Sequence, residues 1–183
     1  MTSKVYLTVS LASLAVCALL RAPSAPAQDA PSHAVPPAIA AAGTQTMNSF
    51  NETADKALAA MKKRAEELKI KGVAVVAYAE GDSVQSWTSK MVVVGHLTTD
   101  PSTSDPKGSN LLGIAYTKAS EMASTLKDSG SKARPPMTGE YGWQGGLVKK
   151  GKAGILIAAF SGGPSADDLK VSRAGLDVLA ESL

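Results

Sequence analysis

The sequence has few of the residues from which disulfide frameworks and metal centres are built. It contains one cysteine, Cys17, and two histidines, His33 and His96, among 183 residues. A single cysteine excludes an intramolecular disulfide framework and a multi-cysteine metal cluster. His33 lies in an alanine- and proline-rich segment. We therefore expect no two-histidine metal site on rigid elements.

The chain also has no large excess of positive or negative charge, and aromatic residues make up only 4% of it. The excess of 19 basic over 16 acidic residues gives a net charge of +3. That excess is too small for a phosphate-neutralising surface, so it argues against a nucleic-acid partner. Because 44% of the residues are apolar, the chain has enough of them for a core and is not predicted to be disordered. Its length fits one ordinary domain.

The first 27 residues predict a secretory signal peptide. Lys4 precedes an apolar segment from Val5 to Leu20, and Ala25-Pro26-Ala27 supplies the small residues that a signal peptidase reads. The apolar segment is shorter than the roughly 20 residues that a membrane-spanning helix needs. The sequence therefore predicts an exported protein, periplasmic or extracellular, with no membrane span once the signal is removed.

Lipoprotein processing at Cys17 is the alternative to cleavage after Ala27, because Leu14-Ala15-Val16-Cys17 resembles a lipobox. Cleavage after Ala27 would remove Lys4, Arg21 and the only cysteine, and no acidic residue. The mature chain would then be thiol-free and near neutral, which suits an oxidising compartment.

Residues 28–46 are rich in alanine, proline and small polar residues and predict a flexible leader. The remaining residues, 47–183, alternate helical and strand patterns, and strands joined by tight turns are antiparallel. The sequence therefore predicts an α+β fold with a single antiparallel sheet of four to five strands packed with helices. The expected elements are a helix of about 20 residues that ends at Gly72, strands at 73–79 and 83–94, a helix at 110–127, strands at 145–148 and 153–160, and a helix from Ser165.

Two motifs favour structural over catalytic interpretations. The segment 146–153 approaches a nucleotide-binding phosphate loop, but Ala153 replaces the magnesium-binding hydroxyl and a strand follows. We expect it to be a basic hairpin turn. Asp167 and Asp168 are adjacent at a helix start that resembles a capping box, so they are interpreted as favourable charges at a helix N-terminus.

Three features are candidates for ligand contacts. His96 follows the second expected strand and is interpreted as either a haem-iron ligand or a solvated loop residue. Tyr141 and Trp143 either form the wall of a flat apolar site or, for Trp143, fill the core. Ser161-Gly162-Gly163-Pro164 either presents free amides to a carboxylate or phosphate or is a plain tight turn.

Several short motifs resemble, in their order, the GlcG/HbpS-like haem-binding family. This family is also called the haem-degrading domain family and includes the C-terminal cobalamin-binding domains of PduO-type proteins. The resemblance spans residues 47–183. The motifs that carry it are Tyr116-Thr117-Lys118-Ala119, Gly145-Gly146-Leu147-Val148, Gly151 to Ile157, Ser161-Gly162-Gly163 and Asp167-Asp168.

The resemblance implies a profilin-like domain that assembles into homo-oligomers and an exported protein that binds haem or a related tetrapyrrole. Haem is the only cofactor that it implies, and we assign no catalytic residue. An oligomeric interaction module without a small ligand, or a weak haem-degrading enzyme, are the alternatives. The candidate cofactor-binding residues are His96, Tyr116, Lys118, Tyr141, Trp143, Gly162 and Gly163.

Overall fold

Two antiparallel hairpins form the only sheet in the part of the chain that the computed structural model describes, residues 37–183, with side chains from residue 49 onward. The expected signal peptide, Cys17, His33 and residues 28–36 of the expected leader lie outside the described residues. The elements follow one another as α1 (Pro37–Glu67), β1 (Gly72–Glu80), β2 (Thr88–Val94), α2 (Leu111–Thr125), β3 (Gly146–Lys150), β4 (Gly154–Ser161) and α3 (Ser165–Ser182). The expected α+β fold with a single antiparallel sheet is confirmed.

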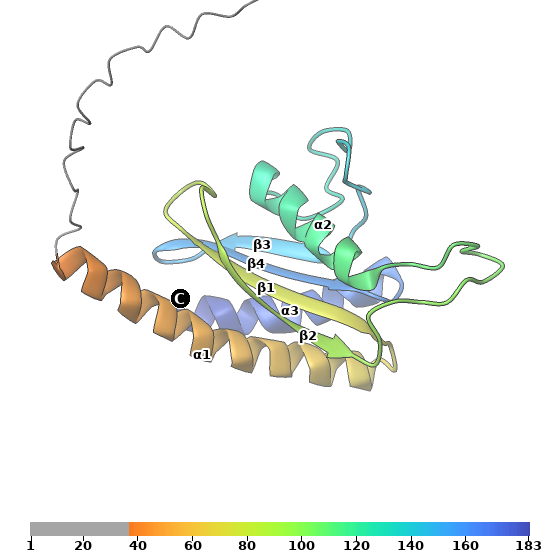
Figure 1. Ribbon diagram of the computed structural model, residues 1–183, viewed down its shortest axis with the longest axis horizontal. Coiled ribbons are helices and arrows are strands. Elements are labelled where there is room, and N and C mark those ends of the chain that lie inside the picture. The colour runs from red at the N-terminus through yellow and green to blue at the C-terminus, as the bar shows by residue number, and fades with distance from the viewer. Residues whose placement is uncertain (1–36) are drawn as a thin grey trace, which may run out of the picture. The chain divides into compact units, whose positions relative to one another are not determined.

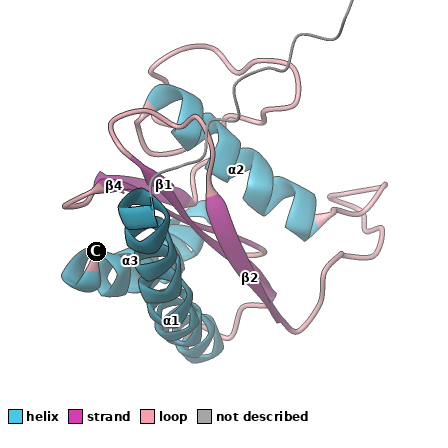
Figure 2. Ribbon diagram, turned by 60° about the vertical axis from the view of Figure 1, so that its left-hand side comes forward, coloured by secondary structure: helices cyan, strands magenta, loops and turns pink. Residues whose placement is uncertain are grey.

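The strands lie in the order β2-β1-β4-β3, and each neighbouring pair is antiparallel. The two central strands, β1 and β4, are buried along nearly their whole length, as their continuous apolar sequences predict. Helices α1 and α3 cover one face of the sheet, and α2 covers the other (Figure 1, Figure 2). The core is therefore divided into two layers by the sheet.

Helix α1 is longer than the sequence indicated. It begins at Pro37, so residues 37–46 are helical although they were expected to belong to the flexible leader. Proline is favoured at the first helical position, and alanine has the highest helix propensity, which explains this extension. The helix ends at Glu67, and Lys69 instead of Gly72 adopts the left-handed conformation beyond its end.

Gly72 belongs to β1, where a Cβ atom would overlap the carbonyl oxygen of Ser161 on β4. The prediction that Gly72 ends the helix is therefore wrong. Its lack of a side chain permits the close approach of two strands.

Helices α1 and α3 pack against each other on their shared face of the sheet. A buried stripe on α1 includes Phe50, Ala54, Leu58 and Met61, and recurs every three or four residues as expected for an amphipathic helix. Gly175 on α3 has no side chain where a Cβ atom would overlap the sulfur of Met61. This glycine lets the two helices approach closely.

The end of α2 and the start of β2 differ from the sequence expectation. Leu126, which lies within the expected helix 110–127, caps α2 in a left-handed conformation with its side chain exposed. Helix α2 therefore ends at Thr125, two residues before the expected end. Strand β2 begins at Thr88 because residues 83–87 form the connection from β1.

The outer edge of β3 is occupied by the chain segment that precedes it. The Gly146 N–H donates to Ser129 Oγ at 2.8 Å, and the Ser129 N–H donates back to the Gly146 carbonyl at 3.2 Å. The Val148 N–H donates to Asp128 Oδ1 at 3.0 Å. Backbone groups that an edge strand would otherwise leave unpaired are thus satisfied within the chain.

The expected basic turn between β3 and β4 is confirmed, since residues 151–153 connect these two strands. No helix within residues 37–183 is long and apolar enough to cross a membrane.

Candidate functional site

A buried ion pair joins α2 to α3 across the end of β4. Lys118 Nζ donates to Asp168 Oδ2 at 2.8 Å, and it also donates to the Phe160 carbonyl at 2.8 Å. The second carboxylate oxygen, Asp168 Oδ1, accepts from the Gly163 N–H at 2.9 Å. The two side chains are only 4% and 3% exposed, so this pair is part of the interior.

Burial acts on both partners in the direction that favours their neutral forms. It lowers the pKa of Lys118 and raises the pKa of Asp168, while the opposite charge of each partner acts against this shift. Gly145 makes room for the pair, because a Cβ atom at that position would overlap Lys118 Nζ. The glycine at the start of the β3 motif is therefore required by the ion pair beside it.

The ion pair forms part of the wall of a cavity of about 530 Å³, which we call the Lys118 cavity. It lies between the N-terminal half of α2, the loop that precedes α2 and the connection from β4 to α3. Its volume is within the range of small-molecule sites. Its lining includes Asp100, Asp105, Leu111, Ile114, Lys118, Trp143, Gln144, Ser161, Gly162, Gly163, Ser165 and Asp168.

Ser161 is the unusual residue of this cavity. It is only 4% exposed, and its hydroxyl group has no hydrogen-bond partner among the described residues. Every fully buried side-chain nitrogen or oxygen atom of the described residues has a hydrogen-bond partner, so the unpartnered Ser161 hydroxyl must reach the surface of the cavity. The Lys118 ammonium group has three N–H donors, of which two are used within the protein. Two polar groups are thus available to a molecule in the cavity.

Four of the seven residues predicted from the sequence line this one cavity: Lys118, Trp143, Gly162 and Gly163. Trp143 is 49% exposed and stacks on Tyr141, with ring centroids 4.6 Å apart. The possibility that Trp143 fills the core is therefore wrong. Tyr141 packs against Trp143 but does not line the cavity.

The structure does not bring His96 and Tyr116 to the cavity. His96 is exposed in the loop after β2. The Tyr116 hydroxyl lies 3.2 Å from Ser89 Oγ, and its ring contacts Trp87 with centroids 6.5 Å apart. These two residues do not form one pocket with Lys118 and Trp143.

The start of α3 also differs from the expectation. Ser165 makes no capping hydrogen bond, and Pro164 occupies the N-cap position, so the predicted capping box is wrong. Asp168 pairs with Lys118 besides carrying charge near the helix N-terminus. The Gly163 amide, which was a candidate for binding an external anion, is occupied by the Asp168 carboxylate.

Gly162 has a structural role beside the cavity. Its φ is +150°, and a Cβ atom there would overlap the Lys71 carbonyl oxygen. This glycine therefore allows the β4–α3 connection to pass close to the start of β1.

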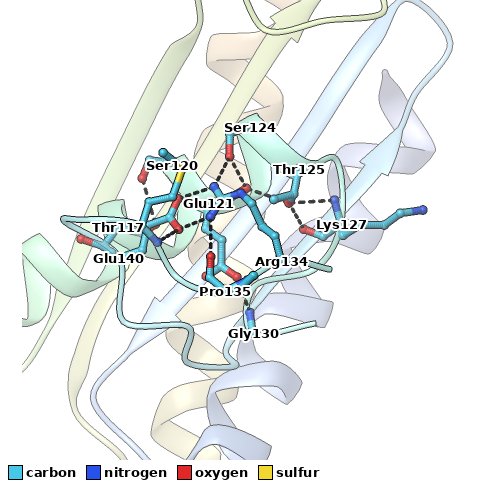
Figure 3. A network of polar contacts seen from close by, with 11 residues as sticks. Thr117, Ser120, Glu121, Ser124, Thr125, Lys127, Gly130, Arg134, Pro135 and Glu140 are labelled. Carbon is cyan, nitrogen blue, oxygen red and sulfur yellow. Dashed lines mark hydrogen bonds and ion pairs between the residues drawn. The ribbon is translucent and has the colours of Figure 1, made fainter. Parts of the chain in front are cut away.

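The loop that carries Trp143 is held to α2 by a network of charged and polar contacts (Figure 3). Arg134 binds both carboxylate oxygens of Glu140 at 2.6 and 2.7 Å and donates to Ser124 Oγ at 2.8 Å. Glu121 on α2 accepts from the Gly130 N–H at 2.9 Å. The Arg134 guanidinium lowers the pKa of Glu140 to about 2, so the contact is ionised at neutral pH.

A larger cavity of about 720 Å³ lies on the other face of the sheet, beside α1 and α3. Its charged lining residues include Arg64 and Lys170, which pair with Glu67 and Asp167. Its buried serine, Ser129, already accepts from Gly146. None of the predicted site residues lines it, so the Lys118 cavity is the stronger candidate site.

Asp168 and Ser161 are the two site residues whose roles sequence reasoning missed. Asp168 lies 50 residues from Lys118 in the chain, and nothing local indicates their pairing. Ser161 appeared only as the first residue of a glycine loop. The alternation of inward and outward positions along the apolar strand 153–160 could have placed Ser161 on the same face as Ala159, towards α2.

Among the described residues, no group of three or more histidine, cysteine, aspartate or glutamate side chains could hold a metal ion. The structure thus defines an α+β domain with a cavity of small-molecule size beside a buried ion pair. No protein-family model and no curated protein matches this sequence. The resemblance to the GlcG/HbpS-like family therefore stays a prediction.

Proposed function

We propose that this protein binds a small molecule in the Lys118 cavity. The observation that carries the proposal is the Ser161 hydroxyl, which belongs to a residue that is only 4% exposed, has no partner among the described residues and lines a cavity of suitable volume. The unused N–H of Lys118 supports it, since this residue lines the same cavity. A half-exposed aromatic ring, Trp143, adds an apolar wall.

A tetrapyrrole bound after export is the specific ligand class that the sequence resemblance implies, and it is the first class to test. The cavity does not fit haem as an iron-coordinated cofactor, because its lining contains no histidine, cysteine, methionine or tyrosine. Our proposal for a tetrapyrrole is therefore limited to binding through ring contacts with Trp143 and polar contacts with Lys118 and Ser161. For the same reason we do not propose haem breakdown.

The test is a titration of residues 28–183 with hemin and, in parallel, with metal-free protoporphyrin IX. Because the lining offers no axial ligand, we expect both compounds to bind with similar affinity. A hemin spectrum identical to that of free hemin, with unchanged protoporphyrin fluorescence over a wide protein range, excludes this ligand class.

Two tryptophan variants show where the ligand binds. Trp143→Ala removes the wall of the cavity, whereas Trp87→Ala changes a tryptophan that does not line it. We expect the first change to weaken binding about tenfold or more and the second to leave it unchanged. Equal effects of the two variants would contradict binding in the Lys118 cavity.

A second candidate function, protein–protein interaction through oligomerisation, is favoured by one observation. Four large apolar side chains that are at least two-fifths exposed lie on the segment from the end of α2 to β3: Leu126, Met137, Tyr141 and Trp143. Exposed apolar groups of this kind mark interaction surfaces when they are contiguous. Light scattering tests this candidate, and we expect Met137→Ser with Tyr141→Ser to dissociate any oligomer. A monodisperse monomer of the unaltered chain would exclude it.

A further inference from the structure

The free polar groups of the Lys118 cavity include both donors and acceptors. Lys118 has one unused N–H donor, and Ser161 can donate and accept. The Asp100 carboxylate, the Ser165 hydroxyl and the Gln144 amide also line the cavity and have no hydrogen-bond partner among the described residues. These last three residues are exposed at the rim of the cavity, where water can also satisfy them. A ligand that bonds to these donors and acceptors would itself carry groups that donate and accept, as hydroxyl groups do.

The charges of the lining oppose an anionic ligand. The positive charge of Lys118 is balanced by Asp168 at 2.8 Å. Asp100 and Asp105 then add two carboxylates that no described cation neutralises, although Asp105 accepts a hydrogen bond from Ser109. The Gly163 amide at the start of α3 is already used by Asp168. A carboxylate beside Asp100 and Asp105 would meet like charges without a free cation to compensate for them, so the propionates of a porphyrin would have to lie outside the cavity, in solvent.

Three large apolar side chains line the cavity beside its polar groups. Leu111 and Ile114 come from α2, and Trp143 presents a ring that is 49% exposed. This arrangement suits a ligand with one apolar face and polar groups around its edge.

We propose that the Lys118 cavity binds a hydroxyl-rich small molecule that is uncharged or positively charged, of the amino-sugar class. The ring of this ligand packs against Trp143. Its hydroxyl groups bond to Ser161 and to the unused N–H of Lys118, and its amine faces Asp100 and Asp105. This inference rests on the proposed small-molecule function and names the ligand chemistry of the same site.

Three monosaccharides that differ mainly in charge test the inference: glucosamine, glucose and glucuronate. Their binding to isotope-labelled residues 28–183 is followed by amide chemical shifts at slightly acidic pH, where the amine is protonated and the carboxylate ionised. We expect glucosamine to bind about tenfold more tightly than glucuronate, with glucose between them, and the largest shifts at Ser161 and Gly163.

Two serine variants locate the contact. Ser161→Ala removes the hydroxyl that lines the cavity and adds no volume, and we expect it to weaken glucosamine binding about five- to tenfold. Ser120→Ala removes an exposed hydroxyl of α2 that does not line the cavity, and we expect no change. Asp100→Asn should reduce the preference for glucosamine over glucose without affecting the binding of glucose.

The outcomes separate this inference from the proposed function. Glucuronate binding as tightly as glucosamine, or equal effects of the two serine variants, would overturn the inference. Porphyrin shifts at Ser161 and Gly163 without any shift from the three sugars would overturn it as well, yet would support the proposed function. If neither the porphyrins nor the sugars shift these amides, both fail.

Discussion

Lys118 illustrates how one residue can serve both the fold and the site. Its ammonium group is held by a carboxylate from α3 and a carbonyl from β4, so it connects α2 to two elements that lie 40 or more residues further along the chain. Burying two charges is costly, and a buried pair is tolerated only when its geometry and its further hydrogen bonds compensate. The pair therefore makes the stability of the domain sensitive to either partner.

Lys118→Met should lower the free energy of unfolding by about 3–5 kcal/mol, because it leaves the Asp168 carboxylate buried without its partner. Urea denaturation measures the loss. Lys118→Met combined with Asp168→Asn should be less destabilised than the sum of the two single variants. A loss below about 1 kcal/mol in Lys118→Met would show that the pair contributes little.

The same variant has a defined pH dependence. Burial raises the pKa of Asp168, and without Lys118 nothing opposes this shift as strongly. A carboxyl group with a raised pKa in the folded state stabilises that state when it is protonated, and this stabilisation disappears as the pH rises through the folded-state pKa. The deficit of Lys118→Met relative to the unaltered protein should therefore shrink as the pH falls from 7 towards 4, in urea titrations at each pH. A deficit that is constant with pH would contradict a buried, ionised Asp168.

Residue types indicated part of the site, and contacts between distant segments supplied the rest. Trp143, Gly162 and Gly163 were found because a tryptophan beside a glycine-rich segment and a glycine loop before a helix are conspicuous, whereas Lys118 was found through the family resemblance. Asp168 was interpreted from its immediate neighbours as a charge at a helix start. It does lie in the first turn of α3, but this interpretation did not include its partner, Lys118. Local patterns do not encode which side chains meet across the sheet.

At the scale of elements, the segment between α2 and β3 behaves as an ordered loop. Arg134 and Glu140 close it with two parallel hydrogen bonds, and Gly130 ties its start to Glu121. These contacts fix the position of the stacked Tyr141 and Trp143 rings at the mouth of the cavity.

The ion pair between Arg134 and Glu140 should persist in mildly acidic solution. The pKa of Glu140 is lowered from 4.5 to about 2, so the stabilisation from its ionised form is present above about 4.5 and is lost as the pH falls through about 2. The indole N–H signal of Trp143 should stay unchanged from neutral pH down to about 4 and shift near pH 2. Glu140→Gln should show the shifted signal at neutral pH, with the Trp87 signal as internal control. A Trp143 signal that titrates near pH 4.5 would contradict the contact.

Gly175 sets the spacing of α1 and α3 on their shared face. Gly175→Val should lower the free energy of unfolding by about 1–3 kcal/mol, because its side chain overlaps Met61. In a double-mutant cycle with Met61→Ala, which frees that space, the combined loss should be smaller than the sum of the two. Thermal denaturation of the four proteins measures the coupling. Strict additivity would show that the helices do not meet at these residues.

The types of the elements could be predicted, whereas several of their ends could not. Runs of valine, isoleucine and alanine between turn residues predicted both hairpins, since such runs have few other stable arrangements. The start of α1 was missed because the prolines at 31, 36 and 37 suggested a flexible leader, although Pro37 occupies the first helical position. The start of β2 was missed because its polar residues carry no clear alternation.

At the scale of the whole molecule, the proposed export predicts the residue at which the mature chain begins. When the full sequence is expressed in a bacterium with a secretory pathway, the exported protein should begin at Gln28, as measured by intact mass. A lipid-modified chain that begins at Cys17 would favour the alternative processing. An uncleaved chain in the cytoplasm would contradict export.

The two edges of the sheet differ in what they could accept from another chain. On β3, Ser129 and Asp128 already bind the outward N–H groups of Gly146 and Val148. On β2, the outer side has no neighbouring strand in the described part of the chain. Among the described residues, an added strand would therefore meet occupied groups at β3, and we expect growth of the sheet, whether in ordered assembly or in aggregation, to favour β2. A charge placed at Met91 or Val93, both half-buried on β2, would be the most direct way to suppress it.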